Sequence, residues 1–177
     1  MRALLLLFIF SSCAPDMEKV NQISAENASL TERGEDVEIQ YSEEGKLRAK
    51  ISAPLVATHN AEEPYMEFTK GLKLNFFDDE LNVTSKLAAN YGIYFTKKEE
   101  MMVRDDVVIV NAKGEMLNTE ELTWRRKDEK LYSGKFVRIT TPEEIIYGTG
   151  FEAKQDFSDY TIKNISGIVH LEKGKVN

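Results

Sequence analysis

The chain has 177 residues and a formal net charge of −7, with 30% charged and 42% apolar residues. A chain of this length suits one domain that buries roughly 70% of its unfolded surface, so it needs no disulfide or metal to hold a core. The excess of acid argues against a nucleic-acid partner, which requires a basic surface. Cys13 is the only cysteine, which excludes an intrachain disulfide and a multi-cysteine zinc site.

The first thirteen residues have the features of an export signal. Arg2 precedes an apolar run over 3–10, and two small residues, Ser11 and Ser12, lie directly before Cys13. The run is too short to cross about 30 Å of hydrocarbon as a helix. Small residues before a lone cysteine resemble the lipobox of bacterial lipoproteins, in which the cysteine is acylated and becomes the first residue. We therefore expect a signal peptide over 1–12 and lipidation at Cys13; the alternative is an ordinary cleaved signal with an incidental cysteine.

Residues 13–36 follow as the lipidated N-terminus and a polar segment. This segment has few large apolar residues and no convincing alternation of apolar and polar residues. Such a composition is typical of a flexible tether. We expect the folded domain to occupy 37–177.

From residue 37 onward, apolar and polar residues alternate with period two, which indicates half-buried strands. A β-branched run over 107–110 is continuous instead, which is consistent with a strand covered on both faces. The alternating sets, each expected to share one face, are Leu47, Ala49, Ile51 and Ala53; Leu72, Leu74 and Phe76; and Leu87, Ala89, Tyr91, Ile93 and Phe95.

Turn-forming residues separate these runs, at 43–46, 77–80, 111–115, 127–130 and 141–144. No persuasive 3.6-residue apolar stripe occurs beyond the signal. The sequence therefore predicts an all-β domain of hairpin-like units. Similar phrases recur about thirty residues apart, at 116–126 and 145–155, as expected for units stacked in series.

The recurring phrase also predicts where strands bend. Leu117 and Thr119 have odd numbers, whereas Leu122 and Trp124 have even numbers, and the next unit repeats this switch around Gly150. A regular strand would turn the second pair to the opposite face. We expect a bulge or bend near Glu120–Glu121 and near Gly150 to bring the apolar residues back to one side.

These motifs together resemble the LptC family, the periplasmic, membrane-anchored component of lipopolysaccharide export. The resemblance covers about residues 40–172 and is carried by L-x-T-x-x-L-x-W (117–124), L-x-S-x-x-x-V-x-I (131–139) and I-x-G-x-G-F-x-A (146–153). Better-known members use a transmembrane helix where this chain has Cys13. The resemblance implies a twisted, OstA-like β-jellyroll of antiparallel strands, slightly open and with an apolar interior.

The family likeness also implies partners and a transport role without a cofactor. The protein would accept lipopolysaccharide from an inner-membrane ABC transporter and pass it to LptA, the periplasmic bridge protein, while a lipid anchor holds it at the inner membrane. The expected partner edge is the last strand, Gly167, Ile168, Val169, His170 and Leu171. The candidate lining of the lipid groove is Leu72, Leu74, Leu87, Ile109, Leu122, Trp124, Val137, Ile139, Phe151 and Ile162, residues that ordinary core packing would use equally well.

Other motifs in the sequence are weaker indications of function. The G-x-G-x-x-A pattern at 148–153 lacks the strand-then-helix context of a dinucleotide site, and His59 and His170 do not have metal-site or triad spacing. The basic residues 125–127 could meet lipid phosphates at a groove mouth, although a solvated hairpin turn explains them as well. Two other function classes stay open: a structural or protein-binding periplasmic lipoprotein, and an enzyme with dispersed carboxylates, such as a glycosidase.

Overall fold

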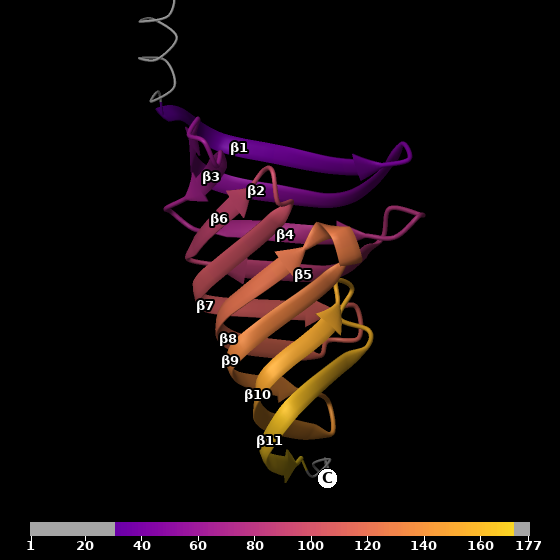
Figure 1. Cartoon of the computed structure of the whole chain (residues 1–177). Coiled ribbons are helices and arrows are strands. Elements are labelled where there is room, and N and C mark those ends of the chain that lie inside the picture. Colours follow the sequence, from indigo (N-terminus) through magenta and orange to yellow (C-terminus); the bar gives the residue numbers. More distant parts are fainter. Residues whose placement is uncertain (1–30, 172–177) are drawn as a thin grey trace, which may run out of the picture.

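The computed structural model describes residues 31–171, which form eleven strands in one antiparallel, hydrogen-bonded sheet (Figure 1). A single 3₁₀ turn, η1 (Arg126–Asp128), joins β8 to β9. The strands are β1 (Thr31–Glu43), β2 (Lys46–His59), β3 (Tyr65–Phe68), β4 (Leu72–Phe77), β5 (Val83–Ala89), β6 (Tyr91–Phe95), β7 (Glu100–Asn111), β8 (Met116–Arg125), β9 (Lys130–Thr140), β10 (Glu144–Lys154) and β11 (Tyr160–His170).

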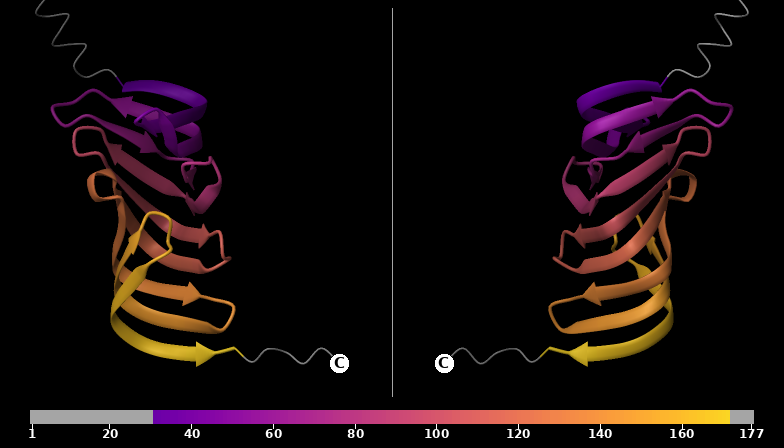
Figure 2. Two further views of the ribbon diagram at one scale, coloured as in Figure 1. Left: turned by 90° about the vertical axis from the view of Figure 1, so that its right-hand side faces the viewer. Right: turned by 90° about the vertical axis from the view of Figure 1, so that its left-hand side faces the viewer.

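Each long strand bends in its middle, so that the sheet folds over into two facing layers. The two halves of β2 pair with different strands, β4 and then β3, and the two halves of β7 pair with β6 and then β5. We call the half that contains β4 and β5 the β4 layer, and the half that contains β3 and β6 the β3 layer. Figure 2 shows the ribbons curving from one layer into the other, stacked in chain order from β1 to β11. The predicted all-β, jellyroll-like architecture is confirmed.

The bends line up along one long side of the molecule, which we call the crease. Register breaks at the crease interrupt the ladders between Arg104 and Val107 and between Thr119 and Thr123. Several crease residues have the left-handed backbone that permits a sharp bend. They are Asp36 (φ 49°), Gly71 (φ 78°), Asp105 (φ 65°), Asp106 (φ 60°) and Gly150 (φ 74°).

The bends expected from the sequence near Glu120–Glu121 and near Gly150 are present at these positions. The sequence does not predict a further bend, which lies at Asn90. Because of this bend, the prediction that Leu87, Ala89, Tyr91, Ile93 and Phe95 share one face is wrong. Leu87 and Ala89 point inward, but the strand breaks at Asn90, whose N–H bonds to the carbonyl of Asp105 at 2.9 Å. Beyond this break the parity reverses: Gly92 is buried and Tyr94 packs on the core, so Tyr91, Ile93 and Phe95 face outward.

Two other expectations need correction. Val107 and Ile109 are buried, but Val108 and Val110 are only half-buried on the outer face, so the run over 107–110 is covered on one face rather than two. The first strand also begins at Thr31, six residues before the domain boundary expected at 37. The alternation of apolar and polar residues along β1 is hard to recognise in the sequence. Most of its positions are exposed to solvent, and the left-handed backbone at Asp36 changes which positions face inward. The signal peptide and Cys13 lie outside the described residues.

The apolar side chains of both layers meet in a continuous interior. Its largest fully buried members include Phe68, Phe76, Phe151 and Phe157. Because β2 and β7 to β10 contribute apolar residues from both of their halves, and β1 and β11 add residues at the two ends, the interior extends along the whole stack.

At the crease, two buried hydroxyls replace backbone pairing that the bend removes. The ladder between β8 and β9 stops between Thr119 and Thr123. Ser133 Oγ donates to the carbonyl of Glu121 at 2.7 Å and accepts from the N–H of Lys135 at 3.1 Å, while Thr119 Oγ1 donates to the carbonyl of Phe136 at 2.9 Å. The buried polar groups of the bend are thereby satisfied.

We predict that Ser133→Ala lowers the free energy of unfolding by about 1–3 kcal/mol, because it removes the partner of the Lys135 N–H and leaves the Glu121 carbonyl with only the long contact from Thr119 Oγ1 at 3.5 Å. Urea denaturation of the two proteins measures the difference. The exposed Ser42 in β1 supplies the control: Ser42→Ala is expected to change stability by less than about 0.5 kcal/mol. Equal effects at the two positions would show that the crease hydroxyls do not stabilise the bend.

Candidate lipid-binding interior

The structure brings the ten predicted groove residues together in the interior between the layers. Nine of them are buried, and Ile162, on the last strand, is partly buried against the same cluster. They come from both layers: Leu74, Leu87 and Ile109 from the β4 layer face Leu122, Trp124 and Phe151 from the β3 layer. These residues share one apolar surface because apolar residues alternate with polar ones within each half-strand, and because the crease turns both halves toward the interior. Their role as a lipid lining stays a prediction.

Side chains fill this interior in residues 31–171. Leu74, Ile109, Leu122, Val137 and Ile139 have no exposed surface. The layers are therefore packed against one another as a core.

The side of the molecule opposite the crease, which we call the seam, is where the turns of the two layers meet. Trp124 of the β3 layer packs edge-on against Phe76 of the β4 layer, with ring centroids 5.3 Å apart, and 6.5 Å from Tyr41. Arg126 lies over the Tyr41 ring at 4.1 Å from its centroid. The seam is thus closed by side chains at its β1 end.

A second aromatic cluster closes the seam farther along the stack. Phe157 comes from the β10–β11 turn and lies 5.9 Å from Phe151 and 5.2 Å from Tyr160. Ser85 Oγ donates to the carbonyl of Gln155 at 2.7 Å, and Asn111 Nδ2 donates to the carbonyl of Phe157 at 3.1 Å. Gln155 links the two clusters, because its side-chain oxygen accepts from Trp124 Nε1 at 3.1 Å.

Burial also perturbs the tyrosines near the interior. Desolvation raises the pKa of Tyr41, Tyr94 and Tyr160 above the ordinary phenol value. These phenols are therefore neutral at physiological pH and add no charge to the apolar interior.

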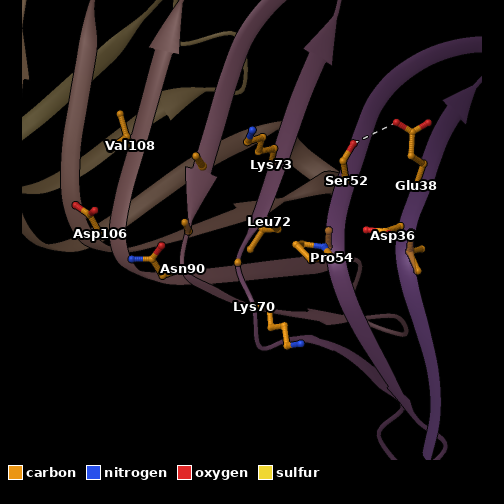
Figure 3. Close-up of a pocket in the computed structure, with 15 residues that line it drawn as sticks. Asp36, Glu38, Ser52, Pro54, Lys70, Leu72, Lys73, Asn90, Asp106 and Val108 are labelled. Atoms are coloured by element: carbon orange, nitrogen blue, oxygen red, sulfur yellow. Dashed lines mark hydrogen bonds between the residues drawn. The ribbon is translucent and has the colours of Figure 1, made fainter.

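The outer surface carries a separate hollow of about 600 Å³ beside the crease (Figure 3). It mixes cationic Lys70 and Lys73 with acidic Asp36, Glu38 and Asp106 over a small apolar floor. Of the predicted groove residues, Leu72 alone is part of its wall. This hollow therefore opens on the outside of the β4 layer and is distinct from the interior.

The basic residues at 125–127 lie at the β8–β9 turn, beside the seam. Arg125 pairs with Glu100 at 2.9 Å, Arg126 pairs with Glu99, and the hollow around them also contains Glu43, Asp128 and Glu129. Because the acidic groups there offset the cations, the contacts support the hairpin-turn interpretation rather than a phosphate site.

The two ends of the stack differ in character. β1 carries five acidic residues and packs Val37, Ile39 and Tyr41 against the core. β11, in contrast, leaves its apolar residues uncovered: Ile165 is 57% exposed and Ile168 48%. Four of the seven large apolar residues exposed within 31–171 are Ile165, Ile168, Val169 and Leu171. Charge protects the edge of β1, whereas the edge of β11 is apolar and pairs, within residues 31–171, with β10 alone.

The predicted partner edge, residues 167–171, coincides with the end of β11 and the residue after it. Leu171 N–H donates to the carbonyl of Glu143 at 2.7 Å, so this N–H points toward β10. Backbone groups alternate in direction along a strand, so the N–H groups of His170 and Ile168 point to the free edge.

Sequence reasoning missed several interior residues. Leu117 and Leu131 are fully buried and follow the same alternation as their neighbours, so the pattern could have found them. Phe157 carries no such signal, because it lies in the polar turn Gln-Asp-Phe-Ser-Asp and has a left-handed backbone (φ 54°). Only the folding of that turn onto the seam places its ring inside.

Residues 31–171 hold no group of three or more His, Cys, Asp or Glu side chains arranged to bind a metal ion. The same residues contain no helix with the length and hydropathy of a membrane span.

The fold and its continuous apolar interior define a β-jellyroll-like protein. The family described as "Lipopolysaccharide-assembly, LptC-related" matches residues 4–167, and the chain belongs to this LptC family. No curated protein matches the chain. Membership implies a role in lipopolysaccharide export as a periplasmic component of the transport system.

We predict that Leu122→Ala lowers the free energy of unfolding by about 2–5 kcal/mol, because it removes a fully buried side chain from a filled interior. Thermal or urea unfolding measures the loss. Leu81→Ala is the matched control, since Leu81 is 60% exposed, and is expected to change stability by less than about 0.5 kcal/mol. A negligible effect at Leu122 would indicate a solvated groove in place of a packed core.

Proposed function

We propose that this protein accepts lipopolysaccharide from an inner-membrane ABC transporter and passes it to an LptA-like bridge protein through the interior between its two layers. The observation that carries the proposal is the LptC family match on a domain whose apolar interior runs the length of the stack. The proposed lining includes the ten interior residues from Leu72 to Ile162 described above.

Exposure of lipid acyl chains to water costs a large free energy, so their transport requires a protein that shields them. A saturated chain of about 14 carbons exposed to water costs about 11 kcal/mol at ~0.8 kcal/mol per methylene. A lipid with several such chains cannot cross an aqueous compartment unshielded. Apolar residues contributed by successive strands supply a continuous alternative to water.

The β11 edge is the proposed site of transfer to the bridge protein. A neighbouring sheet can add to an unpaired edge by main-chain hydrogen bonds, which would continue the interior from one domain into the next. The exposed apolar side chains of β11 favour this end, and the five acidic residues of β1 disfavour non-specific pairing at the other.

The proposed location is the periplasmic face of the inner membrane, with the anchor at Cys13. A single acyl chain gives only marginal membrane binding, whereas two or three chains hold a protein firmly. Residues between Cys13 and β1 would connect the anchor to the domain.

Full-length protein extracted from the membranes of a Gram-negative cell tests both proposals. We expect an intact mass that shows acylation at Cys13 and about one co-purifying lipopolysaccharide per chain, quantified by its hydroxylated fatty acids. Residues 1–30 fused to an unrelated β domain provide the control for lipid carried over by the anchor. Acylated, folded protein with no lipopolysaccharide above this control would favour the protein-binding lipoprotein instead.

We predict that His170→Pro weakens binding to the LptA-like protein of the same cell at least tenfold, because proline removes an N–H that points to the free edge. Binding is measured by pull-down or surface plasmon resonance. His170→Ala keeps this N–H while removing the same imidazole, which lies 3.5 Å from Glu144, and is expected to bind like the wild type. Equal binding by the proline variant would place the interface elsewhere.

A further inference from the structure

The filled interior presents a problem for an amphiphilic cargo. If acyl chains lie between the layers, as the proposed function requires, the attached sugars must stay in water. A slit that joins the interior to solvent therefore has to run along the domain. In residues 31–171 the layers are closed over fully buried residues such as Leu74 and Leu122.

The two long sides of the domain differ in how they are held. At the crease, the strands pass continuously from one layer into the other, so the layers cannot separate there without breaking the chain's own β-ribbons. At the seam, no backbone hydrogen bond within 31–171 joins the two layers: the turn bonds, such as Ala112 N–H to Thr84 and Gln155 N–H to Glu129, stay inside one layer. The crease is therefore suited to act as a hinge and the seam to open.

One turn supplies the hydrogen bonds that hold the seam shut. In the described part of the chain, both direct hydrogen bonds across it run from the β4 layer to carbonyls of the β10–β11 turn. Ser85 Oγ reaches the carbonyl of Gln155 at 2.7 Å, and Asn111 Nδ2 reaches the carbonyl of Phe157 at 3.1 Å. Figure 2 shows this turn (yellow) rising from the β11 end along the side of the stack.

The same turn inserts an aromatic ring between the layers. Phe157 has no exposed surface, although it lies in a turn, and its backbone has a left-handed φ of 54°. A bulky residue rarely adopts this conformation. Its ring contacts Phe151, one of the proposed lining residues, so it fills space that an acyl chain would use.

We propose that the β10–β11 turn, residues 155–159, is the gate through which lipopolysaccharide enters the interior sideways, and that Phe157 is the side chain displaced by the first acyl chain. The inference rests on the proposed function and deepens it. The acyl chain replaces the contacts of the Phe157 ring with Phe151 and Tyr160, so opening exchanges one apolar contact for another. The released turn leaves the sugars in water.

The protein contains a reporter at the gate. Trp124 is the only tryptophan in the chain, is 4% exposed and donates its indole N–H to Gln155 of the turn at 3.1 Å. Movement of the turn breaks this hydrogen bond and changes the surroundings of the indole. Trp124 emission therefore reports opening without an added label.

The test locks the seam in the full-length protein. Ser85→Cys with Gln155→Cys places thiols on opposite sides of the seam, to be joined by oxidation, or by dibromobimane where a direct disulfide does not close. The control, Glu129→Cys with Gln155→Cys, joins two positions within the β3 layer, where the Gln155 N–H already bonds to the Glu129 carbonyl at 2.8 Å. Peptide mass spectrometry verifies each bridge, and purified rough lipopolysaccharide in one fixed detergent is the probe.

We expect the bridge between positions 85 and 155 to lower the captured lipopolysaccharide at least tenfold and to abolish the change in Trp124 emission. Cleavage of the disulfide form by reductant restores both. Because both double variants lack the Gln155 side chain that accepts from Trp124, each bridged protein is compared with its own reduced form, and the control bridge leaves lipopolysaccharide uptake as in that form. Equal uptake and an equal emission change in the locked and reduced proteins would overturn the gate. If the wild type and the reduced protein take up no lipopolysaccharide at all, it is the proposed function that fails.

A milder variant tests the gate without a cross-link. Ser85→Ala removes one hydrogen bond across the seam and leaves the interior apolar residues in place. The net loss of one such bond raises the equilibrium constant for opening of the seam about fivefold. The rate of lipopolysaccharide uptake, measured through Trp124 emission, is therefore expected to rise about fivefold. Asn164→Ala, on the outer face of β11 and away from the seam, is the control. An unchanged rate for Ser85→Ala would contradict the role of the turn.

Discussion

The requirement that one apolar interior serve both halves of the long strands determines this structure. A regular strand alternates faces, so a strand that folds over would present half of its apolar residues to water. The chain solves this with left-handed bends in long strands, as at Asp36 and Gly150, and with the break at Asn90 between β5 and β6. The buried hydroxyls of Thr119 and Ser133 then satisfy backbone groups that the break removes from the ladder. The crease is thus an integral part of the fold, on which the placement of every interior residue depends.

This way of building an interior gives the domain two unequal sides. The crease is held by continuous backbone, whereas the seam is held by side-chain packing and by bonds to one turn. Side-chain contacts can be exchanged for contacts with an apolar ligand at little net cost, because dispersion and burial are not specific to protein. Backbone pairing has no such substitute in a lipid. A domain that must hold itself together while admitting a lipid is therefore expected to open at a seam of this type.

Much of the fold could be predicted from the sequence because period-two patterns hold within each half-strand. Leu72, Leu74 and Phe76 were placed correctly, and the parity switch around Gly150 located a bend. The pattern failed at Asn90, where no glycine marks the break, and Tyr91, Ile93 and Phe95 were assigned to the wrong face. It also failed at Phe157, whose turn is held on the seam by bonds from Ser85 to the Gln155 carbonyl and from Asn111 to the Phe157 carbonyl, far away in the sequence. Local patterns cannot contain such long-range information.

The interior residues also show why core and lipid lining look alike in a sequence. Both demand apolar side chains on the same face of each strand, and Leu122 or Val137 satisfies either role with the same atoms. What separates the roles is the energy needed to part the layers, which depends on the seam. The exposed residues Ile165 and Ile168 extend the same apolar face to the β11 end, where no further strand of the described chain covers it. An acyl chain that has entered at the seam would therefore find apolar contacts all the way to the edge at which a second β domain can add.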